Sequence, residues 1–321
     1  MPKLDPPNPT PTVAFIGFGE AAQAFTKGWT TTIDATIRAY DRKTDTAQTG
    51  PASNVQTRAR KRADYTNAGV AECLSLTAAL ANANANDDVI FSMVTADQAK
   101  TAGLAAAAHI APNTLYFDCN SCAPDTKRAI ADAIDAAGGR YVDVAIMAPV
   151  HPKLHRVPVL VSGPHTPAAL AMMQRLDMAA NPANPHGNGD IGDASSIKMV
   201  RSIMVKGLEA LMAECLLAGR RAGVEETVFD TLDASYPGFD FRKRAAYGLD
   251  RMIEHGNRRA AEMREVALTV DHLGLDNAMS RAIVDWQQTI GDLDLTPQNS
   301  THTDGADAIL AALPPKPETR K

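Results

Sequence analysis

The sequence predicts an α/β fold in two parts: a doubly wound parallel sheet with helices on both faces, followed by an all-helical C-terminal domain. Short apolar runs alternate with helix-forming segments through the first half of the 321 residues. A segment crowded with Pro, Gly and Asn follows at 181–192. Beyond it, residues 194–223 contain no proline and keep one helical periodicity. We therefore expect one domain over 1–190 and a second over 191–321.

The first strand and helix surround a pair of glycines. An apolar run over 13–16 leads into Gly17-Phe18-Gly19, and small residues then begin a helix. Gly17 permits a tight turn, and Gly19 leaves room for a pyrophosphate to approach the backbone and the helix N-terminus. An ordinary strand-to-helix turn is the alternative. The pattern is typical of a Rossmann dinucleotide-binding fold, and it nominates as cofactor-binding residues Gly17, Phe18, Gly19, Glu20 and Ala21.

An acidic residue ends the second predicted strand. Residues 35–40 are predicted as the second strand, which ends in Asp41, about 20 residues after the glycines, as this fingerprint expects. A carboxylate there accepts hydrogen bonds from both ribose hydroxyls and repels a 2′-phosphate, which favours NAD. Arg42, directly behind it, would instead hold that phosphate. The cofactor is therefore NAD or NADP, with NAD slightly favoured.

The remaining strands are predicted over 68–72, 89–94, 115–118, 141–145 and 157–161, and Ser75 caps a helix over 76–83. In a parallel sheet, ligands bind outside the carboxyl ends of the strands. Several polar or flexible side chains fall at or just beyond such ends, namely Glu20, Asp41, Thr95, Asn120 and Met147. We expect them to line one edge of the sheet.

A long helix over 194–223 is predicted to leave the nucleotide domain. Lys198, Ser202 and Lys206 fall at i, i+4 and i+8, so they share one face. A lysine near the start of such a helix can exchange a proton with a substrate oxygen while a hydride moves. An exposed lysine on an amphipathic helix is the alternative. Further helices are predicted over 242–255, 258–273 and 277–288, and the tail from Thr296 is expected to be loose at its end.

Composition excludes several classes of protein. Apolar residues make up 45% and charged residues 21%, which is normal for a soluble globular protein. The net charge of −5 gives no bulk attraction to nucleic acid, and the basic cluster at 58–62 has no interleaved aromatic residues, so a solvated helix or loop is expected there. No apolar run has the length of a membrane span, and the Pro-rich N-terminus lacks a signal-peptide core. We expect a cytoplasmic protein without nucleic-acid or membrane partners.

Two cysteines are close in the sequence. Cys119 and Cys122 have the spacing C-x-x-C, but no second pair of metal ligands accompanies them. We therefore expect no metal site. Reduced cysteines in a loop are the favoured interpretation, and a redox pair is the alternative.

Five segments in this order resemble the β-hydroxyacid dehydrogenase superfamily, which includes 3-hydroxyisobutyrate and 6-phosphogluconate dehydrogenases. They are 17–20, 41–42, 118–124, 143–149 and 192–202. The run Lys198-Met199-Val200-Arg201-Ser202, followed by Lys206-Gly207-Leu208-Glu209, is similar to a 6-phosphogluconate-dehydrogenase-like branch with its own C-terminal domain. The resemblance implies an NAD(P)-dependent oxidoreductase that interconverts an alcohol and a carbonyl on a small polar, anionic, 3-hydroxyacid-like substrate. It also implies a homodimer formed through the helical domain.

The resemblance carries over to two loops of the nucleotide domain. Met93, Val94 and Thr95 match the loop that passes the cofactor ribose and nicotinamide. Asn120 and Ser121 match a Ser-Thr pair beside the nicotinamide, with Asn120 a departure, and both would bind substrate.

On the long helix, the resemblance makes Lys198 the catalytic general acid and base. Ser202 stands where the family has a substrate-orienting asparagine, and Arg201 stands beside it as a further substrate-binding residue.

The largest departure from the family lies at Met147-Ala148-Pro149, where Ser-Gly-Gly normally holds the substrate carboxylate. Met147 has no hydroxyl and Pro149 has no N–H, so this segment lacks two of the donors with which the family binds the carboxylate. By its position, Met147 is still predicted to be a substrate-binding residue. Four basic side chains follow, which would form a different anion site together with Arg201 or else a basic surface loop. They are His151, Lys153, His155 and Arg156, of which His151 is the nominated substrate-binding residue.

Two alternatives to an alcohol dehydrogenase remain open. One is an imine reductase, against which Lys198 argues because enzymes of that kind usually lack this lysine. The other is a nucleotide-binding redox sensor or accessory protein without turnover, which the loss of Ser-Gly-Gly would explain. The dehydrogenase interpretation is favoured because Lys198 has no purpose in a pure sensor.

Overall fold

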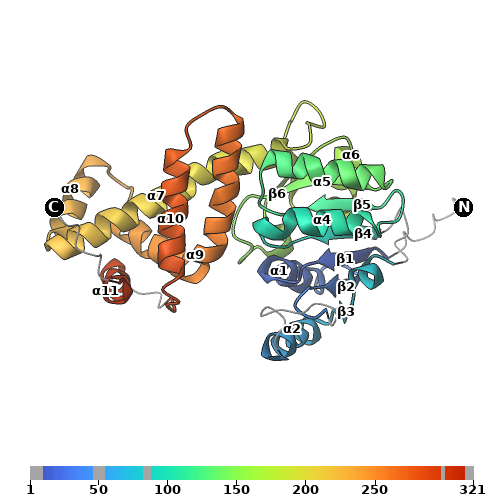
Figure 1. The fold of residues 1–321 in the computed structure, drawn as a ribbon, viewed down its shortest axis with the longest axis horizontal. Coiled ribbons are helices and arrows are strands. Elements are labelled where there is room, and N and C mark those ends of the chain that lie inside the picture. Colours follow the sequence, from blue (N-terminus) through green and yellow to red (C-terminus); the bar gives the residue numbers. More distant parts are fainter. Residues whose placement is uncertain (1–9, 46–54, 82–87, 298–300, 315–321) are drawn as a thin grey trace, which may run out of the picture. The chain divides into compact units, whose positions relative to one another are not determined.

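The computed structural model describes residues 10–45, 55–81, 88–297 and 301–314. The chain divides into two compact units, Met1–Lys198 and Met199–Lys321. The division falls within helix α7 (Asp193–Ala222), whose first turns belong to the first unit and whose remainder belongs to the second (Figure 1). The sequence placed this boundary before the helix, at residue 190.

The first unit contains one eight-stranded sheet with the order β3-β2-β1-β4-β5-β6-β7-β8. Its strands are β1 (Thr12–Ile16), β2 (Thr36–Tyr40), β3 (Ala71–Glu72), β4 (Asp88–Ser92), β5 (Leu115–Asp118), β6 (Arg140–Ile146), β7 (Val159–Ser162) and β8 (Ala180–Pro182). In the parallel register Ile16 lies beside both Tyr40 and Ser92, and Ser92 lies beside Asp118. The segments that follow β1, β2, β4 and β5 therefore leave the sheet at one edge, as predicted.

One strand departs from the predicted direction. β7 pairs antiparallel with β6, with Ile146 opposite Val159, whereas the other pairs are parallel. The connection over 147–158 contains the short 3-10 helix η3 (Leu154–Arg156) in place of a crossover helix. A parallel strand needs a crossover that is usually an α-helix, and this connection of twelve residues contains only one short 3-10 helix, which is consistent with a return in the opposite direction. The predicted doubly wound parallel sheet is confirmed, with β7 as its one antiparallel strand among the described residues.

Helices cover both faces of the sheet (Figure 1). They are α1 (Glu20–Trp29), α2 (Val55–Ala68), α3 (Leu76–Leu80), η2 (Ala96–Gln98), α4 (Ala99–Ala107), α5 (Pro124–Ala136) and α6 (Thr166–Arg175). Alternate residues of a strand point to opposite faces. Val13 and Phe15 accordingly join a core with α1, α2 and α6, while Ala14 and Ile16 join a second core with α3, α4 and α5. Ser75 caps α3 by accepting a hydrogen bond from the N–H of Ala78, as predicted; residues 82 and 83 of that predicted helix lie outside the described residues.

All elements described in the second unit are helices: the rest of α7, then α8 (Glu225–Ser235), α9 (Phe241–His272), α10 (Ala278–Gly291) and α11 (His302–Ala312). The sequence predicted two helices where α9 is continuous. A Cβ on Gly256 would lie 2.4 Å from the carbonyl oxygen of Gln287, and one on Gly291 would lie 2.6 Å from the nitrogen of Asn257. Gly256 is therefore a point of close contact between α9 and α10, and not a helix end.

The helix α11 was not among the predicted helices, and the end of the tail, which was expected to be loose, lies outside the described residues. Thr301 and Asp304 form a capping box at its start, and Ala306 and Ile309 are buried in the core of this unit. Pro315 and Pro317 lie outside the described residues.

Across the segments that the structure describes, no helix has both the length and the hydropathy to cross a membrane. The same segments hold no group of three or more His, Cys, Asp or Glu side chains arranged to bind a metal ion.

Candidate functional site

The turn after β1 can be made only by a residue without a side chain. Gly17 has φ +85°, and its N–H donates to the carbonyl oxygen of Tyr40 at 2.7 Å. A Cβ at this position would lie 2.5 Å from the carbonyl oxygen of Met93. Real Cβ atoms do not approach oxygen so closely, so the glycine allows the turn to pack beneath the end of β4.

Asp41, at the end of β2, is fixed against this turn. Its Oδ2 accepts a hydrogen bond from the N–H of Phe18 at 3.1 Å, and its Oδ1 accepts one from the N–H of Lys43 at 3.0 Å. The Phe18 ring is fully buried and stacks on Tyr65, with ring centroids 5.0 Å apart. Phe18 can therefore face a ligand only through its backbone, whereas the half-buried Asp41 keeps a negative charge beside the turn.

The N-terminus of α1 is open. Gly19 is the N-cap residue, no side chain caps the helix, and nothing lies within 4 Å of the position where a Cβ of Gly19 would stand. Glu20 is exposed and Ala21 half-buried in the first turn. The first N–H groups of a helix have no acceptor within the helix, so an anion is bound readily there. A diphosphate fits this cradle, which a side chain on Gly19 would fill.

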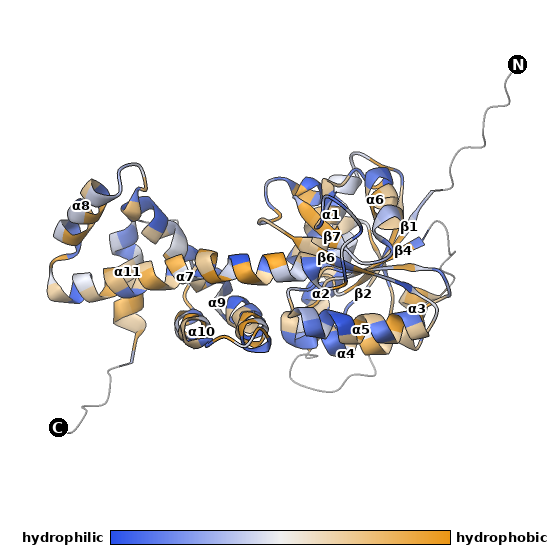
Figure 2. Cartoon of the chain, turned by 90° about the horizontal axis from the view of Figure 1, so that it is seen from above, coloured by the Kyte–Doolittle hydropathy of each residue, from blue (hydrophilic) through white to orange (hydrophobic). Residues whose placement is uncertain are grey.

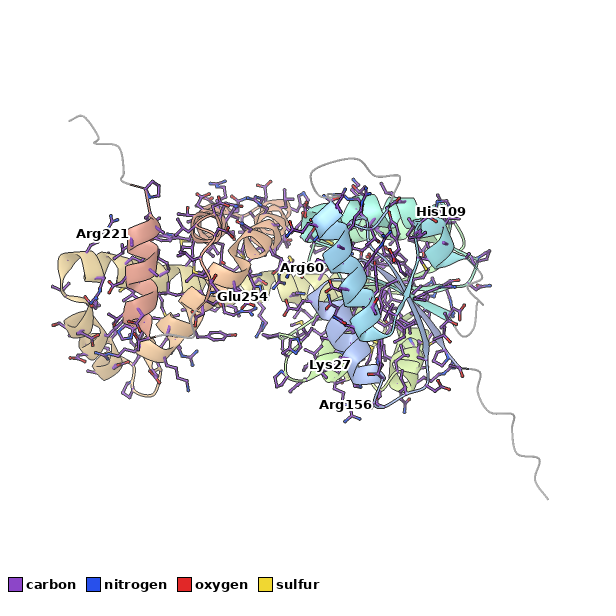
Figure 3. The ribbon with its side chains drawn as sticks, turned by 90° about the horizontal axis from the view of Figure 1, so that it is seen from below. Lys27, Arg60, His109, Arg156, Arg221 and Glu254 are labelled. Atoms are coloured by element: carbon purple, nitrogen blue, oxygen red, sulfur yellow. The ribbon has the colours of Figure 1, made fainter. Side chains whose placement is uncertain are left out.

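One residue of the basic cluster belongs to this site. Arg60 is exposed on α2, as predicted for a solvated helix (Figure 3). Lys61 is buried instead: its Nζ donates to the carbonyl oxygen of Phe18 at 2.7 Å and lies 2.8 Å from Oδ2 of Asp64. The expectation of a solvated residue was wrong for Lys61. Its spacing of four from the buried Tyr65 places both on the inner face of α2, a signal that the sequence contained.

The loop after β4 lies beside the glycine turn. The N–H of Met93 donates to the carbonyl oxygen of Ile16 at 2.8 Å, and Thr95 is exposed at the start of η2. Arg42 reaches from β2 to this loop, with its Nη1 donating to Oε1 of Gln98 at 3.0 Å. The predicted cofactor residues from three strands are thus gathered at one edge of the sheet.

Asn120 joins the loops after β4 and β5. Its Oδ1 accepts a hydrogen bond from the N–H of Val94 at 2.7 Å, and its Nδ2 donates to Oγ of Ser92 at 3.0 Å and to Oδ1 of Asp118 at 2.7 Å. The side chain is buried, and both amide hydrogens are used within the protein. Asn120 therefore holds the two loops together. Its contact with substrate, and that of the half-buried Ser121, stay predictions.

Three charged residues beneath this edge are fully buried, and we call Asp118, Lys127 and Asp143 the buried ion cluster. Nζ of Lys127 lies 3.1 Å from Oδ1 of Asp118 and 3.3 Å from Oδ1 of Asp143, and it donates to the carbonyl oxygen of Asp118 at 2.6 Å. Burial alone lowers the pKa of Lys127, but the two carboxylates outweigh it and raise the pKa. The hydroxyl of Tyr141 donates to Oδ2 of Asp118 at 2.9 Å.

This cluster was not predicted, although the sequence contains a signal for it. Lys127 on α5 precedes the buried residues Ile130 and Ile134 by three and seven positions. A charged residue on an apolar helix face needs a buried partner of opposite charge. Asp118 and Asp143, each within an apolar strand run, are those partners.

The first turn of α7 is bound to the sheet through Asp143. Its Oδ2 accepts hydrogen bonds from the N–H and the Oγ of Ser195, both at 3.0 Å, and from Oγ of Ser162 at 3.2 Å. Oγ of Ser162 accepts from the N–H of Ala194 at 3.1 Å. A carboxylate at a helix N-terminus is favoured by the unpaired N–H groups and the helix dipole. The strand end therefore fixes where α7 begins.

Lys198 follows Ser195 by three residues and is half-buried. Burial raises the pKa of the thiol of Cys119, at the end of β5, and the positive charges of Lys127 and Lys198 act in the opposite direction. Ser195, three residues before Lys198, is bound to Asp143, which is the register partner of Asp118 at the end of β5. The helix turn before the predicted catalytic lysine therefore starts at the edge of the sheet where the glycine turn lies, and the catalytic role of Lys198 stays a prediction.

The basic residues after β6 do not gather as one group. Nε2 of His155 lies 3.3 Å from Oδ2 of Asp177, and Arg156 forms an ion pair with the same carboxylate. His155 is buried against α1, where a Cβ on Gly28 would lie 1.9 Å from its Nδ1. His155 and Arg156 therefore bind Asp177, and the anion site that was one of the two alternatives for these four basic residues would have to form without them. The roles of the exposed His151 and Lys153 stay predictions.

Met147 is half-buried, and its N–H donates to the carbonyl oxygen of Pro158 at 2.9 Å. The N–H of Met147 is therefore already used, and Pro149 has no N–H. Of the three residues 147–149, only Ala148 has an N–H available to a substrate. The binding of substrate by Met147 itself stays a prediction.

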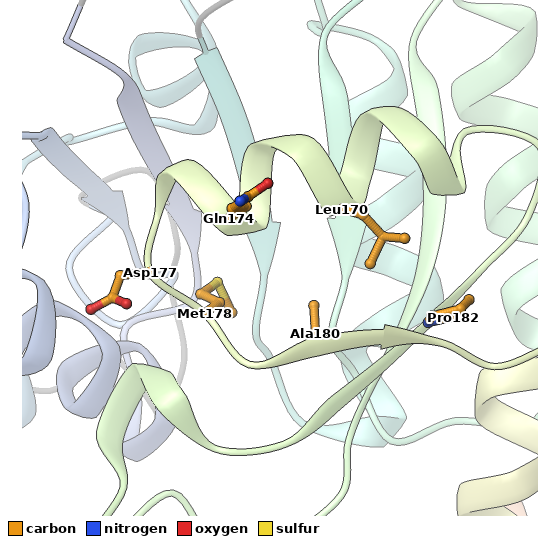
Figure 4. Close-up of a pocket in the computed structure, with 6 residues that line it drawn as sticks. All are labelled: Leu170, Gln174, Asp177, Met178, Ala180 and Pro182. Atoms are coloured by element: carbon orange, nitrogen blue, oxygen red, sulfur yellow. The ribbon is translucent and has the colours of Figure 1, made fainter. Parts of the chain in front are cut away.

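Asp177 also lines a pocket between α6 and β8, away from the glycine turn (Figure 4). The lining residues are Leu170, Gln174, Asp177, Met178, Ala180 and Pro182. Asp177 supplies the one carboxylate among these lining residues, and this carboxylate is already paired with Arg156 and His155. The lining therefore offers no unpaired charge to a ligand.

In the second unit, Arg201 is exposed and Ser202 is buried on α7. Lys206 is buried, with its Nζ 2.7 Å from Oε2 of Glu262 on α9, and a second buried ion pair joins Arg259 to Glu209. Lys206 therefore binds α7 to α9. The substrate roles of Arg201 and Ser202 stay predictions.

Cys119 and Cys122 are both buried, and neither forms a disulfide. Both lie in the segment between β5 and α5, as predicted for a loop, and the choice between reduced cysteines and a redox pair stays a prediction.

A glycine turn, an open helix N-terminus and a carboxylate on the second strand define a dinucleotide-binding domain of the Rossmann class. Residues 12–166 match the family model described as the NAD binding domain of 6-phosphogluconate dehydrogenase, and residues 220–290 match a domain of unknown function, DUF1932. The chain belongs to the β-hydroxyacid dehydrogenase superfamily, in the branch that carries this distinct C-terminal domain.

Solved structures agree with this assignment. A conserved hypothetical protein from Sinorhizobium meliloti 1021 is 33% identical, with 95% of this chain and 98% of that chain covered and a TM-score of 0.67. The conserved protein MTH1747, of unknown function and structurally similar to 3-hydroxyacid dehydrogenases, is 28% identical, with coverage of 88% and 97% and a TM-score of 0.60. A 3-hydroxyisobutyrate dehydrogenase from Mycobacterium tuberculosis shares the fold at 14% identity, with coverage of 94% and 99% and a TM-score of 0.68.

Proposed function

We propose that this protein is an NAD(P)-dependent dehydrogenase that interconverts an alcohol and a carbonyl on a small polar substrate, with Lys198 as general acid and base. The observation that carries the proposal is the position of Lys198. It follows the first turn of α7, which Asp143 anchors beside Asp118 at the end of β5, two residues before Asn120. The superfamily supports the reaction class, and the open cradle at Gly19 supports the cofactor.

The nicotinamide, when bound, supplies or accepts the hydride. Lys198 handles the proton, since its ammonium donates one to the carbonyl oxygen during reduction and recovers it during oxidation. Asn120 and Asp118 hold the loop at Val94 through hydrogen bonds. This loop therefore keeps its position during the proton transfer. The half-buried position of Lys198 limits its access to water.

Replacement of Lys198 tests the role of this residue. We expect Lys198→Ala to lower turnover of the best substrate from a panel of small 3-hydroxy and 3-oxo acids by about 10²- to 10⁴-fold, because general acid–base catalysis contributes that much. Cofactor affinity should stay within about twofold, because Lys198 lies outside the glycine turn. Full turnover by Lys198→Ala would remove the assignment. Reduction of cyclic imines that is unaffected by Lys198→Ala would identify an imine reductase, and tight cofactor binding with no turnover would identify a sensor.

We propose NAD as the preferred cofactor. Two backbone N–H groups hold the carboxylate of Asp41 beside the turn, where it would accept hydrogen bonds from a ribose and repel a 2′-phosphate. Arg42, exposed and bonded to Gln98, is the competing phosphate ligand. Isothermal titration of the wild type should give tighter binding of NADH than of NADPH by about tenfold or more, and Asp41→Asn should reduce that preference. Tighter binding of NADPH, lost in Arg42→Ala, would show that Arg42 selects the cofactor.

We also propose that the protein forms a homodimer through its helical domain. Val200, Met204 and Leu211 are spaced at i, i+4 and i+11 on α7 and are 52%, 66% and 61% exposed, along a helix with many apolar residues (Figure 2). A second copy of this chain would cover that face. Sedimentation velocity should show a dimer that Met204→Glu dissociates, whereas Leu104→Glu, on α4 of the first unit, leaves it intact. A wild-type monomer at micromolar concentration would contradict the proposal.

A further inference from the structure

Two segments at the edge of the sheet are bound to the buried ion cluster from opposite sides. On one side, Oδ1 of Asp118 accepts hydrogen bonds from the backbone N–H and the Nδ2 of Asn120, which in turn holds the N–H of Val94. On the other side, Oδ2 of Asp143 holds Ser195 in the first turn of α7. The loop at Val94 and the start of α7 thus end on the two carboxylates of one cluster.

Lys127 is the group between these carboxylates. Asp118 and Asp143 are neighbours in the register of β5 and β6, and both are fully buried. Two carboxylates this close repel each other unless a cation lies between them. Nζ of Lys127 is 3.1 Å from one and 3.3 Å from the other, so a single ammonium decides the separation of the two.

The cluster has little freedom to rearrange. Oδ1 of Asp118 and Oδ2 of Asp143 each accept several hydrogen bonds, and Tyr141 occupies Oδ2 of Asp118. Movement of either carboxylate would leave a buried charge without its partner, which is costly in a low dielectric. A displacement at Ser195 is therefore resisted through Asp143, Lys127 and Asp118 as far as Asn120.

We propose that Lys127 is a positioning residue that fixes the first turn of α7 and the loop at Val94 at one separation. The consequence for catalysis rests on the proposed function: Lys198 follows Ser195 by three residues, so the same cluster would set the place of the proton donor relative to the nicotinamide. Lys127 itself, fully buried, touches neither substrate nor cofactor.

Hydrogen–deuterium exchange on the full chain without cofactor tests this coupling. Ser195→Ala removes one hydroxyl that donates to Asp143 and leaves the three ions in place. We expect exchange to rise about fivefold over 193–199, the equivalent of one buried hydrogen bond. We also expect a rise of at least twofold over 93–97 and 119–123, while 13–16 stays unchanged. Ser280→Ala, an equally buried serine on α10, is the matched control and should leave all of these segments unchanged.

Two outcomes would overturn the proposal. A rise confined to 193–199 would show that the cluster does not connect the two segments. A uniform rise, including 13–16, would show that Ser195 contributes only to the stability of the domain. Ser162→Ala, which removes another donor to Asp143, repeats the test if Ser195→Ala does not fold. The measurement uses neither cofactor nor substrate, so failure of the proposed function would leave its result intact.

A double-variant cycle separates positioning from structure once a substrate is known. We expect Ser195→Ala to lower kcat about fivefold or more with NADH affinity unchanged, and to have no further effect in Lys198→Ala, because the two then act through one group. If the two substitutions instead lowered kcat independently, so that their effects multiplied in the double variant, Ser195 would not act through Lys198.

Discussion

Two ends of the same sheet edge are built in opposite ways. After β1 and β2, the polar groups are backbone N–H groups at an uncapped helix and one half-buried carboxylate, beside open space at Gly19. After β5 and β6, three full charges are buried, and hydrogen bonds within the protein join them to Asn120, Tyr141 and Ser195. The first arrangement leaves capacity to bind a ligand. In the second arrangement, the charged groups are all paired within the protein and fix the positions of neighbouring segments. A charged side chain at this edge is therefore not by itself evidence of a binding residue.

The largest expected effect is on the buried end. Lys127→Ala would leave Asp118 and Asp143 without a cation, and removing one partner of a buried ion group typically destabilises by about 3–5 kcal/mol. Urea denaturation would measure this, with Lys100→Ala on the exposed side of α4 as the control, expected within about 0.5 kcal/mol of wild type. A loss below about 1 kcal/mol would mean that water reaches the cluster.

The same variant predicts a pH dependence. The pKa of Lys127 is raised in the folded protein, so its contribution is complete below the ordinary lysine pKa of about 10.4 and is lost only as the pH rises through the folded value. In Lys127→Ala the two buried carboxylates lack their cation and bind a proton more readily, so the difference in stability from wild type should grow as the pH rises from about 5 to about 9. A difference that does not change with pH would contradict the ionised state of the cluster.

Two glycine substitutions at the open end should have different effects, one on protein stability and the other on cofactor affinity. Gly17→Ala places a Cβ 2.5 Å from a carbonyl oxygen at φ +85°, and we expect a loss of about 2–4 kcal/mol in the free energy of unfolding. Gly19→Ala meets no atom within 4 Å, so stability should change by less than about 1 kcal/mol while NADH affinity falls by about tenfold or more. Thermal unfolding and isothermal titration on both variants test this pair. Unchanged NADH affinity in Gly19→Ala would place the diphosphate elsewhere.

The smallest effect concerns the thiols of the buried end. Burial raises the pKa of the Cys119 thiol, so little thiolate forms near neutral pH and disulfide reagents react slowly. We expect Cys119 and Cys122 to resist labelling at pH 8 in the native protein and to react fully in denaturant, as peptide mass mapping would show. Rapid native labelling of both would favour the redox interpretation of the C-x-x-C pair.

The open end of the edge was largely predictable from the sequence. Gly17, Gly19 and Asp41 follow from local rules about turns, helix ends and the spacing of an acid, and the structure gathers them as expected. Those rules need only a few consecutive residues. The two-part fold followed from equally local periodicities.

The buried end was not predicted, because it depends on residues far apart in the sequence. Asp118, Lys127 and Asp143 become neighbours only when β5, α5 and β6 pack together. In the same way, His155 and Arg156 are drawn away from the site by Asp177, which no spacing rule connects to them. The hydrogen bonds of Asn120 could not be predicted for the same reason, since its amide group binds Ser92 at the end of β4 and Val94 in the loop after it.

The contact between α9 and α10 predicts a sequence feature by which distant homologues of this domain could be recognised. Gly256 and Gly291 each lie against the backbone of the other helix, so a side chain at either position would force the helices apart. A substitution at one glycine cannot be compensated at the other, because in both cases the nearest atom of the other helix is a main-chain atom. We expect distant sequences with this domain to retain both glycines at a nearly constant interval, the first within an uninterrupted helical pattern. Such a pair would mark the domain in proteins whose similarity is otherwise too low to detect.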